Sequence, residues 1–322
     1  MIAREGAEHP AVRAWRKLEP ASAGPESVQL RRERASCAIY RLTGVGSGGT
    51  AVFAKRCRAS RAPVERAVYA EILPLLPVTS PRCYGIVEDD GGSCWLFLED
   101  VGNERYGASD PEQCALAGRW LGLMHTSTTM VADAATAAAR LPDGGPGRYL
   151  GHLRSARADI LRNLSNPALT AEEVALLGTL ASQLDLLERR WGWLEESCPR
   201  VPSTLVHGDF RPKNAYIRRD QGEARLFPID WEMAGWGVPA ADLTRVDVTA
   251  YWEVVREPWS VDLPAVRRLA TVGQVFRFLA AVSWASPGLA YDSPEFLSLP
   301  VADMRALQAR LSDAVRAADE AA

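Results

Sequence analysis

Three polar side chains in one part of the sequence, Asp209, Asn214 and Asp230, are suited to metal and phosphate chemistry. Their carboxylate and amide oxygens are hard donors of the kind that Mg²⁺ accepts. Three such groups at the mouth of a strand pair suit phosphoryl transfer, in which two groups hold the metal on a nucleotide and one receives the proton of the acceptor hydroxyl. For each aspartate alone, a turn cap is the simpler interpretation. The combination of the three favours the functional interpretation.

The residues between Asn214 and Asp230 predict how these side chains meet. We expect 215–218 and 224–227 to form two antiparallel strands joined by a polar turn. If the turn pivots near Gly222, positions 214 and 230 are equidistant from the pivot. Asn214 is then expected to face Asp230 across the hairpin.

The spacing His207-x-Asp209-x-x-x-x-Asn214 is that of a kinase catalytic loop. Asp230 takes the place of the later metal-binding aspartate of that pattern. The two features together predict that the protein transfers phosphoryl groups.

Lysine is rare in this sequence, and this draws attention to Lys55. Only three of the 37 basic residues are lysines. Lys55 ends the predicted strand 50–55, and a helix is predicted over 62–73. We choose Glu65 of that helix as the partner of Lys55, because kinases hold a phosphate-binding lysine with a helix carboxylate. Glu71 of the same helix could also reach Lys55. A solvated helix face is the alternative for both glutamates and is the better account of Glu71.

Two segments are candidates for nucleotide contacts. The run Gly44–Gly49 matches G-x-G-x-x-G, but a strand follows it where a dinucleotide site needs a helix, so we interpret it as a hairpin turn. The loop expected to cover the phosphates is 33–36, with Ser36 and its backbone N–H groups as contacts; an ordinary polar turn is the alternative. The polar link after a second predicted hairpin is the expected hinge, where backbone groups of Glu99 and Val101 can pair with a base.

The chain divides into two patterns. Strand-like segments joined by short loops fill the first hundred residues after a leader that is either a helix or loosely held, and helical periodicity follows. We therefore predict an α+β fold with two lobes. Residues 1–100 form a small antiparallel-sheet lobe that binds nucleotide, and residues 101–322 form a larger, mainly helical lobe with the catalytic loop and the acceptor site.

Other polar residues of the second lobe have less specific patterns. His125 is interpreted as a packed structural histidine, and Asp242 is expected to cap a helix after an irregular Gly- and Pro-rich loop. Candidates for an acceptor pocket are the polar and aromatic residues Asp247, Tyr251, Trp252, Glu253 and Glu257. Helix-surface and core positions explain these five residues equally well.

The composition is that of an ordinary globular protein, 322 residues long with 47% hydrophobic and 24% charged residues. A net charge of −3, with no basic run that contains aromatics, gives no reason to expect nucleic-acid binding. The six cysteines form no C-x-x-C pair, so neither a zinc site nor a disulfide framework is expected. No signal-peptide pattern and no apolar run of membrane-spanning length is found, so we expect a cytoplasmic protein without membrane contact.

The chain resembles the aminoglycoside phosphotransferase family, which is related to choline kinases and more distantly to protein kinases. The resemblance covers roughly 28–246 and is carried, in chain order, by Lys55, Glu65, the His207–Asn214 block, Ile229-Asp230-Trp231-Glu232 and Asp242-Leu243. It implies a two-lobed protein-kinase-like fold with ATP or GTP and Mg²⁺ between the lobes.

The resemblance also implies a role for each matching residue of the catalytic region. Asp209 becomes the catalytic base or hydroxyl-orienting group, and Asn214 and Asp230 become the metal ligands. Arg211, two residues after the base, bears on the transferred phosphoryl group, with a solvated position as the alternative. Asp242 matches a structural position that supports the catalytic loop.

On the nucleotide side, the resemblance makes Lys55 the phosphate-binding lysine and Glu65 its partner. Two departures from the family pattern concern substrates. The loop that contains Ser36 lacks glycines, and no acidic cluster near the carboxyl terminus marks an aminocyclitol site.

We therefore predict a Mg²⁺-dependent small-molecule O-phosphotransferase that is a monomer or homodimer. It moves the γ-phosphoryl group of ATP or GTP to a hydroxyl of an antibiotic of the aminoglycoside or nucleoside type, giving resistance or self-protection. The alternatives are a metabolic kinase for choline, a sugar or an amino alcohol, and a catalytically silent kinase-like module that binds nucleotide. Intact Lys55, Asp209, Asn214 and Asp230 count against the silent module.

Overall fold

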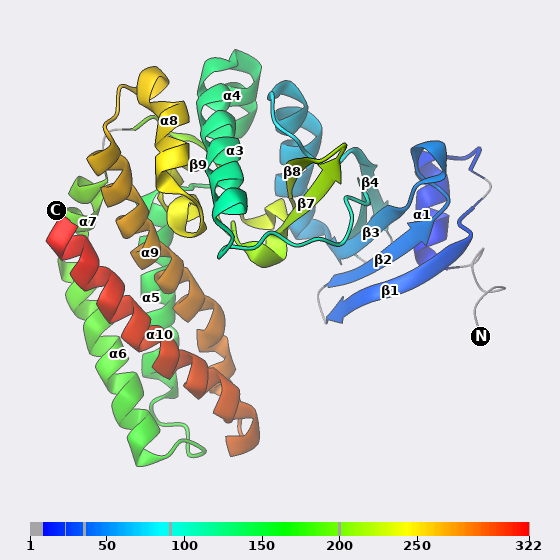
Figure 1. Ribbon diagram of the computed structural model, residues 1–322. Coiled ribbons are helices and arrows are strands. Elements are labelled where there is room, and N and C mark those ends of the chain that lie inside the picture. Colours follow the sequence, from blue (N-terminus) through cyan, green and yellow to red (C-terminus); the bar gives the residue numbers. More distant parts are fainter. Residues whose placement is uncertain (1–8, 23, 35–36, 90–91, 199–200, 322) are drawn as a thin grey trace.

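A sheet at one end and a helical body at the other make up the molecule (Figure 1). The computed structural model describes residues 9–22, 24–34, 37–89, 92–198 and 201–321. The five strands of the sheet are antiparallel to their neighbours in the order β1-β2-β3-β5-β4. Their bounds are β1 Ser27–Arg34, β2 Cys37–Thr43, β3 Val52–Arg58, β4 Cys83–Asp89 and β5 Ser93–Glu99. The predicted meander and the following hairpin are confirmed.

A helix of the amino-terminal leader, α1 (Pro10–Leu18), packs against this sheet. Its Trp15 is buried, and the indole ring lies 5.3 Å from the rings of both Tyr84 and Phe97. Burial of this large aromatic side chain stabilises the packing of α1 on the sheet. Of the two alternatives for the leader, a helix or a loosely held segment, the structure therefore shows the helix.

The segment after β3 forms the predicted helix in three pieces. Helix α2 (Ala62–Arg66) continues as a π-helix over Ala67–Ile72 and a 3₁₀ turn over Leu73–Leu75. Lys55 lies in the middle of β3, opposite Ile39 and Leu96, and not at the end of the strand as predicted. The strand continues because the pairing with β5 extends to Arg58.

The hairpin next to the candidate site consists of β7 (Ala215–Asp220) and β8 (Glu223–Pro228). The two turn residues, Gln221 and Gly222, have φ values of 52° and 90°, as a tight two-residue hairpin turn requires. The pivot therefore lies between these two residues, and the Ile229 N–H donates to the Asn214 carbonyl at 2.8 Å. The predicted register was wrong by one residue, since Asn214 faces residue 229 and not Asp230.

The helical body has three long helices side by side, α6, α9 and α10, with α5 packed against α6 and α9 (Figure 1). The predicted caps are present at Asp110, which accepts N–H groups of the first turn of α3, and at Thr170, which begins α6 with a capping box. The helices are α3 Pro111–Met130, α4 Ala132–Ala138, α5 Pro146–Asn163, α6 Ala171–Arg189, α7 Trp191–Ser197, α8 Val248–Trp259, α9 Leu263–Ala285 and α10 Pro294–Ala321. None of the helices in the described ranges is long and apolar enough to cross a membrane.

A continuous hydrophobic core joins the sheet to the helical body. It includes Val68 and Leu96 from the sheet side and Leu121 and Met124 from α3. The π-helix packs against α4, and α3 packs against β8. This shared core fixes the position of Lys55 relative to the β7–β8 hairpin.

Candidate active site

Asp209 lies in the loop that follows β6 (Thr204–Val206). Gly208 has a φ of 74°, and a Cβ atom there would collide with the Met233 carbonyl oxygen. The Asp242 carboxylate accepts the N–H groups of His207 and Gly208 at 2.7 and 3.0 Å. The loop thus has a fixed shape that only glycine permits at position 208.

Asp242 supports this loop, as the resemblance implied, and does not cap a helix, so the prediction of a helix cap was wrong. It lies inside a 3₁₀ helix, Pro239–Arg245, and is fully buried. Burial raises the pKa of its carboxyl, but the neighbouring His125 and His207 side chains and the His207 backbone N–H group together lower the pKa below the usual value. Two backbone N–H donors stabilise this buried carboxylate, whereas a helix cap would place it at an exposed helix end.

His125 is a structural histidine, as predicted. Its ring is fully buried, with Nδ1 3.0 Å from the Tyr251 hydroxyl and Nε2 3.6 Å from Asp242. Burial lowers the pKa of His125 more strongly than Asp242 raises it. The ring is therefore neutral at pH 7 and acts as packing beneath the catalytic loop.

His207 connects the Asp209 loop to the Asp230 segment. Its Nδ1 accepts the Asp209 N–H at 3.3 Å, and its Nε2 lies 3.0 Å from the Ile229 carbonyl oxygen. Because a carbonyl only accepts, this pair of contacts assigns the proton to Nε2. This imidazole thereby links the Asp209 loop to the segment that carries Asp230.

The Asp209 carboxylate is surrounded by cations. Its Oδ1 lies 2.8 Å from both Arg211 Nε and Arg277 Nη1. Its Oδ2 accepts from Arg211 Nη2 and Asn214 Nδ2 at 2.9 Å each, and Lys213 Nζ is 3.4 Å away. Three cationic side chains therefore converge on one buried carboxylate.

These partners keep Asp209 ionised. Burial raises the pKa of its carboxyl, but the hydrogen bond from Arg277 and the charges of Arg211, Arg277 and Lys213 outweigh burial and lower the pKa below the usual value. A carboxylate in this state can orient a hydroxyl and receive its proton only while one of its oxygens is released from a cation.

The Lys55 ammonium has the opposite surroundings, with two carboxylates around one cation. Its Nζ is 3.0 Å from both oxygens of Glu65 and 2.6 Å from Asp230 Oδ1. Burial lowers the pKa of Lys55, but the two carboxylates outweigh it and hold the pKa well above the ordinary value. The structure thus brings the predicted Lys55–Glu65 pair together and adds Asp230 from the other side of the molecule.

Asp230 directly follows Ile229, the residue that faces Asn214 at the mouth of the hairpin. Asp230 adopts a left-handed conformation, φ 67° and ψ 59°, which is uncommon for a residue with a side chain and concentrates at functional sites. Burial raises the pKa of its carboxyl, but Lys55 foremost, with His207 and Lys213, lowers the pKa below the usual value. Asp230 is therefore anionic at neutral pH.

The donor set at this mouth fits a magnesium ion bound together with phosphate. The Asn214 amide nitrogen donates to the Asp209 carbonyl and carboxylate at 3.0 and 2.9 Å, which leaves the amide oxygen for another partner. Asp230 supplies a carboxylate. No group of three His, Cys, Asp or Glu side chains in the described ranges could hold a metal alone. Mg²⁺ commonly takes one or two protein ligands and completes its shell with phosphate oxygens and water.

In the predicted hinge, Glu99 is held by contacts of both its side chain and its backbone. The Glu99 carboxylate pairs with Arg218 at 2.6 Å, and the Glu99 N–H donates to the Arg82 carbonyl at 2.8 Å. The side chain of Val101 is buried, and its backbone N–H has no acceptor within the described residues. That N–H is available to a ligand. Ser36 lies outside the residues that the structure describes.

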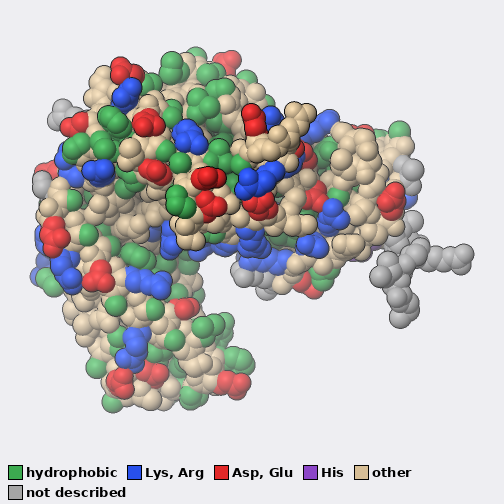
Figure 2. Space-filling model, viewed as in Figure 1, with side chains coloured by type: hydrophobic (Ala, Val, Ile, Leu, Met, Phe, Trp, Pro, Cys, Tyr) green, Lys and Arg blue, Asp and Glu red, His purple; other side chains and the backbone are tan. Residues whose placement is uncertain are grey.

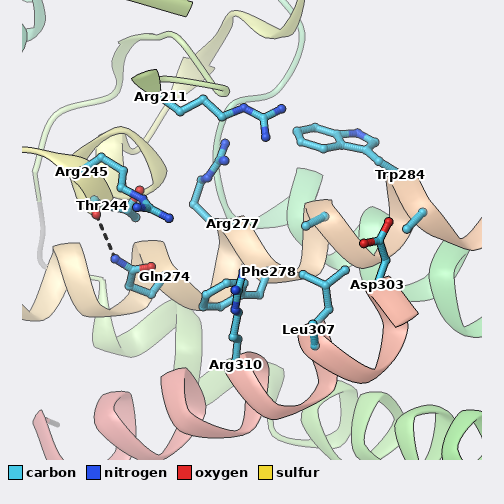
Figure 3. A pocket seen from close by; sticks show the side chains of 13 residues that line it. Arg211, Thr244, Arg245, Gln274, Arg277, Phe278, Trp284, Asp303, Leu307 and Arg310 are labelled. Atoms are coloured by element: carbon cyan, nitrogen blue, oxygen red, sulfur yellow. Dashed lines mark hydrogen bonds between the residues drawn. The ribbon is translucent and has the colours of Figure 1, made fainter. Parts of the chain in front are cut away.

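A cavity of about 450 Å³ opens beside the Asp209 cluster, between α9 and α10 (Figure 3). Arg211 and Arg277 form its upper wall, Arg245 and Arg310 its side and floor, and Trp284 its far end. Its volume lies in the range of small-molecule sites. The wall residues come from the catalytic loop, the 3₁₀ helix and the two last helices.

The five residues predicted to line an acceptor pocket do not line this cavity. Asp247 caps α8 by accepting the N–H groups of Thr249 and Ala250, and Tyr251 is buried against His125. Helix α8, which carries or borders these residues, packs on α3. Sequence reasoning also missed Arg277, Trp284 and Arg310, since arginine is common throughout this chain and helical periodicity gave no reason to select one.

Known proteins share this architecture. The model of the phosphotransferase enzyme family (APH) matches residues 27–281. The GDP and kanamycin complex of APH(2″)-IIIa is similar to this chain with a TM-score of 0.63 and 16% identity, over 92% of this chain and 97% of that chain. A choline kinase from Cryptosporidium parvum Iowa II has a TM-score of 0.60 and 13% identity, over 89% of this chain and 90% of that chain. The spectinomycin phosphotransferase APH(9)-Ia, in complex with ADP and spectinomycin, has a TM-score of 0.56 and 11% identity, over 90% of this chain and 94% of that chain. No curated protein sequence matches the chain.

The family match spans most of the 322 residues. The resemblance stated from the motifs and the α+β, two-lobed protein-kinase-like fold are therefore confirmed. The chain belongs to the phosphotransferase enzyme family and is an enzyme that transfers a phosphoryl group to a hydroxyl acceptor.

Proposed function

We propose that this enzyme, as a monomer or homodimer, transfers the γ-phosphoryl group of ATP or GTP to a hydroxyl of a small molecule. Residues 1–100 act as the nucleotide lobe and residues 101–322 as the catalytic and acceptor lobe. The observation that carries the proposal is the contact of Lys55 Nζ with both Glu65 and Asp230, at 3.0 and 2.6 Å, which joins the two lobes at one charged centre. GDP and ADP in the similar structures support a nucleotide co-substrate.

On the nucleotide side, Lys55 binds the phosphates and Glu65 holds it in place. The ammonium exchanges its contact with Asp230 for phosphate oxygens, and Asp230 and the Asn214 amide oxygen would then hold Mg²⁺. A magnesium ion in this position neutralises charge on the β- and γ-phosphoryl oxygens. Backbone groups of Glu99 and Val101 pair with the base.

On the acceptor side, Asp209 orients the hydroxyl and receives its proton. The hydroxyl oxygen forms a bond to the γ-phosphorus while the bond from that phosphorus to the bridging oxygen breaks, and the nucleoside diphosphate leaves with the electron pair. Arg211, which already contacts both Asp209 oxygens, stabilises the transferred group. Ser36 remains a candidate cover for the phosphates.

The acceptor proposed from the sequence is an antibiotic of the aminoglycoside or nucleoside type, with resistance or self-protection as the biological role. Kanamycin and spectinomycin in two of the similar structures support this class, and the similarity to a choline kinase supports the metabolic alternative. Family membership favours either enzyme over a catalytically silent module.

The experiment that tests the proposal measures nucleoside diphosphate release from MgATP and MgGTP with a panel of hydroxyl-bearing antibiotics and metabolites. We expect a phosphorylated product, identified by mass spectrometry, from at least one acceptor, and none with the Asp209→Ala variant. Failure of the wild-type protein both to bind and to hydrolyse either nucleotide would refute the proposal.

A further inference from the structure

The cavity beside Asp209 is cationic. Four arginines among the described residues line it, Arg211, Arg245, Arg277 and Arg310, against one lining carboxylate, Asp303. Figure 2 shows Lys and Arg side chains gathered along the upper wall of the hollow between the helical body and the sheet. Asp209 behind the wall adds one negative charge, which leaves the guanidinium groups in excess.

Two of these arginines have no partner among the described residues. Arg211 and Arg277 are paired with Asp209, whereas the guanidinium groups of Arg245 and Arg310 form no ion pair or hydrogen bond within the described ranges. Both are exposed, and Figure 3 shows them facing the cavity from two sides. Nearby guanidinium groups of a concave wall attract anions and bind carboxylate or phosphate oxygens in pairs.

We propose that the acceptor of this enzyme carries a carboxylate or phosphate group, which Arg245 and Arg310 bind while its hydroxyl reaches Asp209. This inference rests on the proposed function and specifies its substrate class. An aminoglycoside or choline would place ammonium groups against four guanidinium groups, and like charges at close range in a binding site are costly. Anionic antibiotics and anionic metabolites fit the wall.

The remaining walls suit the uncharged part of such a molecule. The Trp284 ring is 38% exposed at the end of the cavity, with Arg211 Cζ 5.8 Å from its centroid. Phe278 lies between Arg277 and Arg310, and Leu307 lies farther along the wall toward Asp303 (Figure 3). A flat or apolar portion can pack there while polar groups at its two ends contact arginines and Asp209.

An anionic acceptor also explains how the contact between Arg277 and the Asp209 carboxylate loosens when the acceptor binds. Both of its oxygens are in contact with cations before the acceptor binds. Arg277 comes from α9, and its guanidinium borders both Asp209 and the cavity. An acceptor anion gives Arg277 a second oxygen partner, which weakens one of the two arginine contacts on Asp209 Oδ1 and lets that oxygen accept the hydroxyl in its place. A cationic acceptor offers Arg277 no such exchange.

The test measures acceptor binding to the full-length protein saturated with MgADP, by calorimetry, and product formation with MgATP. The probes are glucuronate and glucose 6-phosphate as carboxylate and phosphate anions, glucose as the neutral match, and choline and kanamycin as cations. We expect at least one anion to bind at millimolar concentration or below, and neither cation to bind. The two anions distinguish carboxylate from phosphate recognition.

Two variants and a matched control locate the binding. Arg245→Gln and Arg310→Gln each remove one unpaired charge, and we expect each to weaken anion binding by about tenfold or more. Arg305→Gln makes the same charge change on α10, at an exposed arginine paired with Glu172, and should bind the anion as the wild type does. A merely global effect of charge would weaken all three variants alike.

The outcomes separate this inference from the proposed function. Binding of a cation or of glucose without binding of either anion overturns the inference, as does anion binding that survives both substitutions, or binding by no probe at all. In each of these cases MgADP binding by the wild type leaves the proposed function intact. Loss of MgADP binding by the wild type itself would instead contradict the proposed function.

Discussion

Two charged clusters at the candidate active site have opposite compositions. On the sheet side, one ammonium, Lys55, lies between two carboxylates, Glu65 and Asp230. On the helical side, one carboxylate, Asp209, lies among three cations, two arginines and a lysine. Both clusters are largely buried, with side-chain exposures of 12% for Lys55 and 8% for Asp209.

The difference between the clusters supports the ligand proposed for each. A buried cluster with excess negative charge is completed by a cation, and one with excess positive charge by an anion. The Lys55 cluster is thus suited to Mg²⁺ with a nucleotide, and the Asp209 cluster to the transferred phosphoryl group and an anionic acceptor. His207 contacts both the Asp209 loop and the Ile229 carbonyl group just before Asp230, and so connects the two clusters.

The largest expected effect comes from Asp209→Asn, which removes the proton acceptor and retains the shape of the side chain. We expect kcat to fall by about 10²–10⁴-fold, because general-base catalysis has that magnitude. Steady-state kinetics with any active acceptor measures it. Asp143→Asn, on the loop before α5, is the control for the loss of one negative charge. A kcat within a few-fold of the wild type would remove Asp209 from its proposed role.

The next effect concerns the support of the Asp209 loop. Asp242→Ala leaves the N–H groups of His207 and Gly208 buried without an acceptor, and should reduce the free energy of unfolding by on the order of 3 kcal/mol. Asp247→Ala removes a helix cap and should cost about 1 kcal/mol. Denaturant titration compares the two. Equal losses would mean that Asp242 contributes no more than an ordinary cap.

The smallest effect is a dependence on pH. The pKa values of Asp209, Asp230 and Asp242 are lowered in the folded protein relative to 3.8. Their contribution to stability is therefore fully present above about pH 4 and is lost as the pH falls through the lower folded-state pKa values. Unfolding free energies measured between pH 7 and pH 3 should decrease only at the acid end.

The same pKa shift limits the pH profile of catalysis. Because Asp209 stays ionised above its lowered pKa, it should produce no acid limb in kcat/KM between pH 5 and pH 8. An acid limb in that range that disappears in Asp209→Asn would show that the surrounding cations do not control Asp209.

The sequence predicted the local parts of the site well. The spacing from His207 to Asn214 and the position of Glu65 near the start of the helix after the Lys55 strand determined those contacts, because loop length and strand order leave few alternatives. The caps at Asp110 and Thr170 were also predictable, since capping depends on neighbouring residues only.

The sequence could not predict contacts set by tertiary packing. The predicted hairpin register was wrong by one residue because the sequence around Gly222 is compatible with both a two-residue turn and a longer turn. Arg277 was missed since nothing local distinguishes it from the many other arginines, and only the packing of α9 brings it to Asp209. Asp242 was assigned to a cap because its two donors lie more than thirty residues away.

The most direct test of the two-cluster account is calorimetric binding of ADP with and without Mg²⁺ to the wild type, Asp230→Asn and Asp209→Asn. The account predicts that Mg²⁺ strengthens ADP binding to the wild type and to Asp209→Asn, and that this gain is lost in Asp230→Asn. Loss of the gain in both variants, or in Asp209→Asn alone, would contradict the division of the site into a nucleotide cluster and an acceptor cluster.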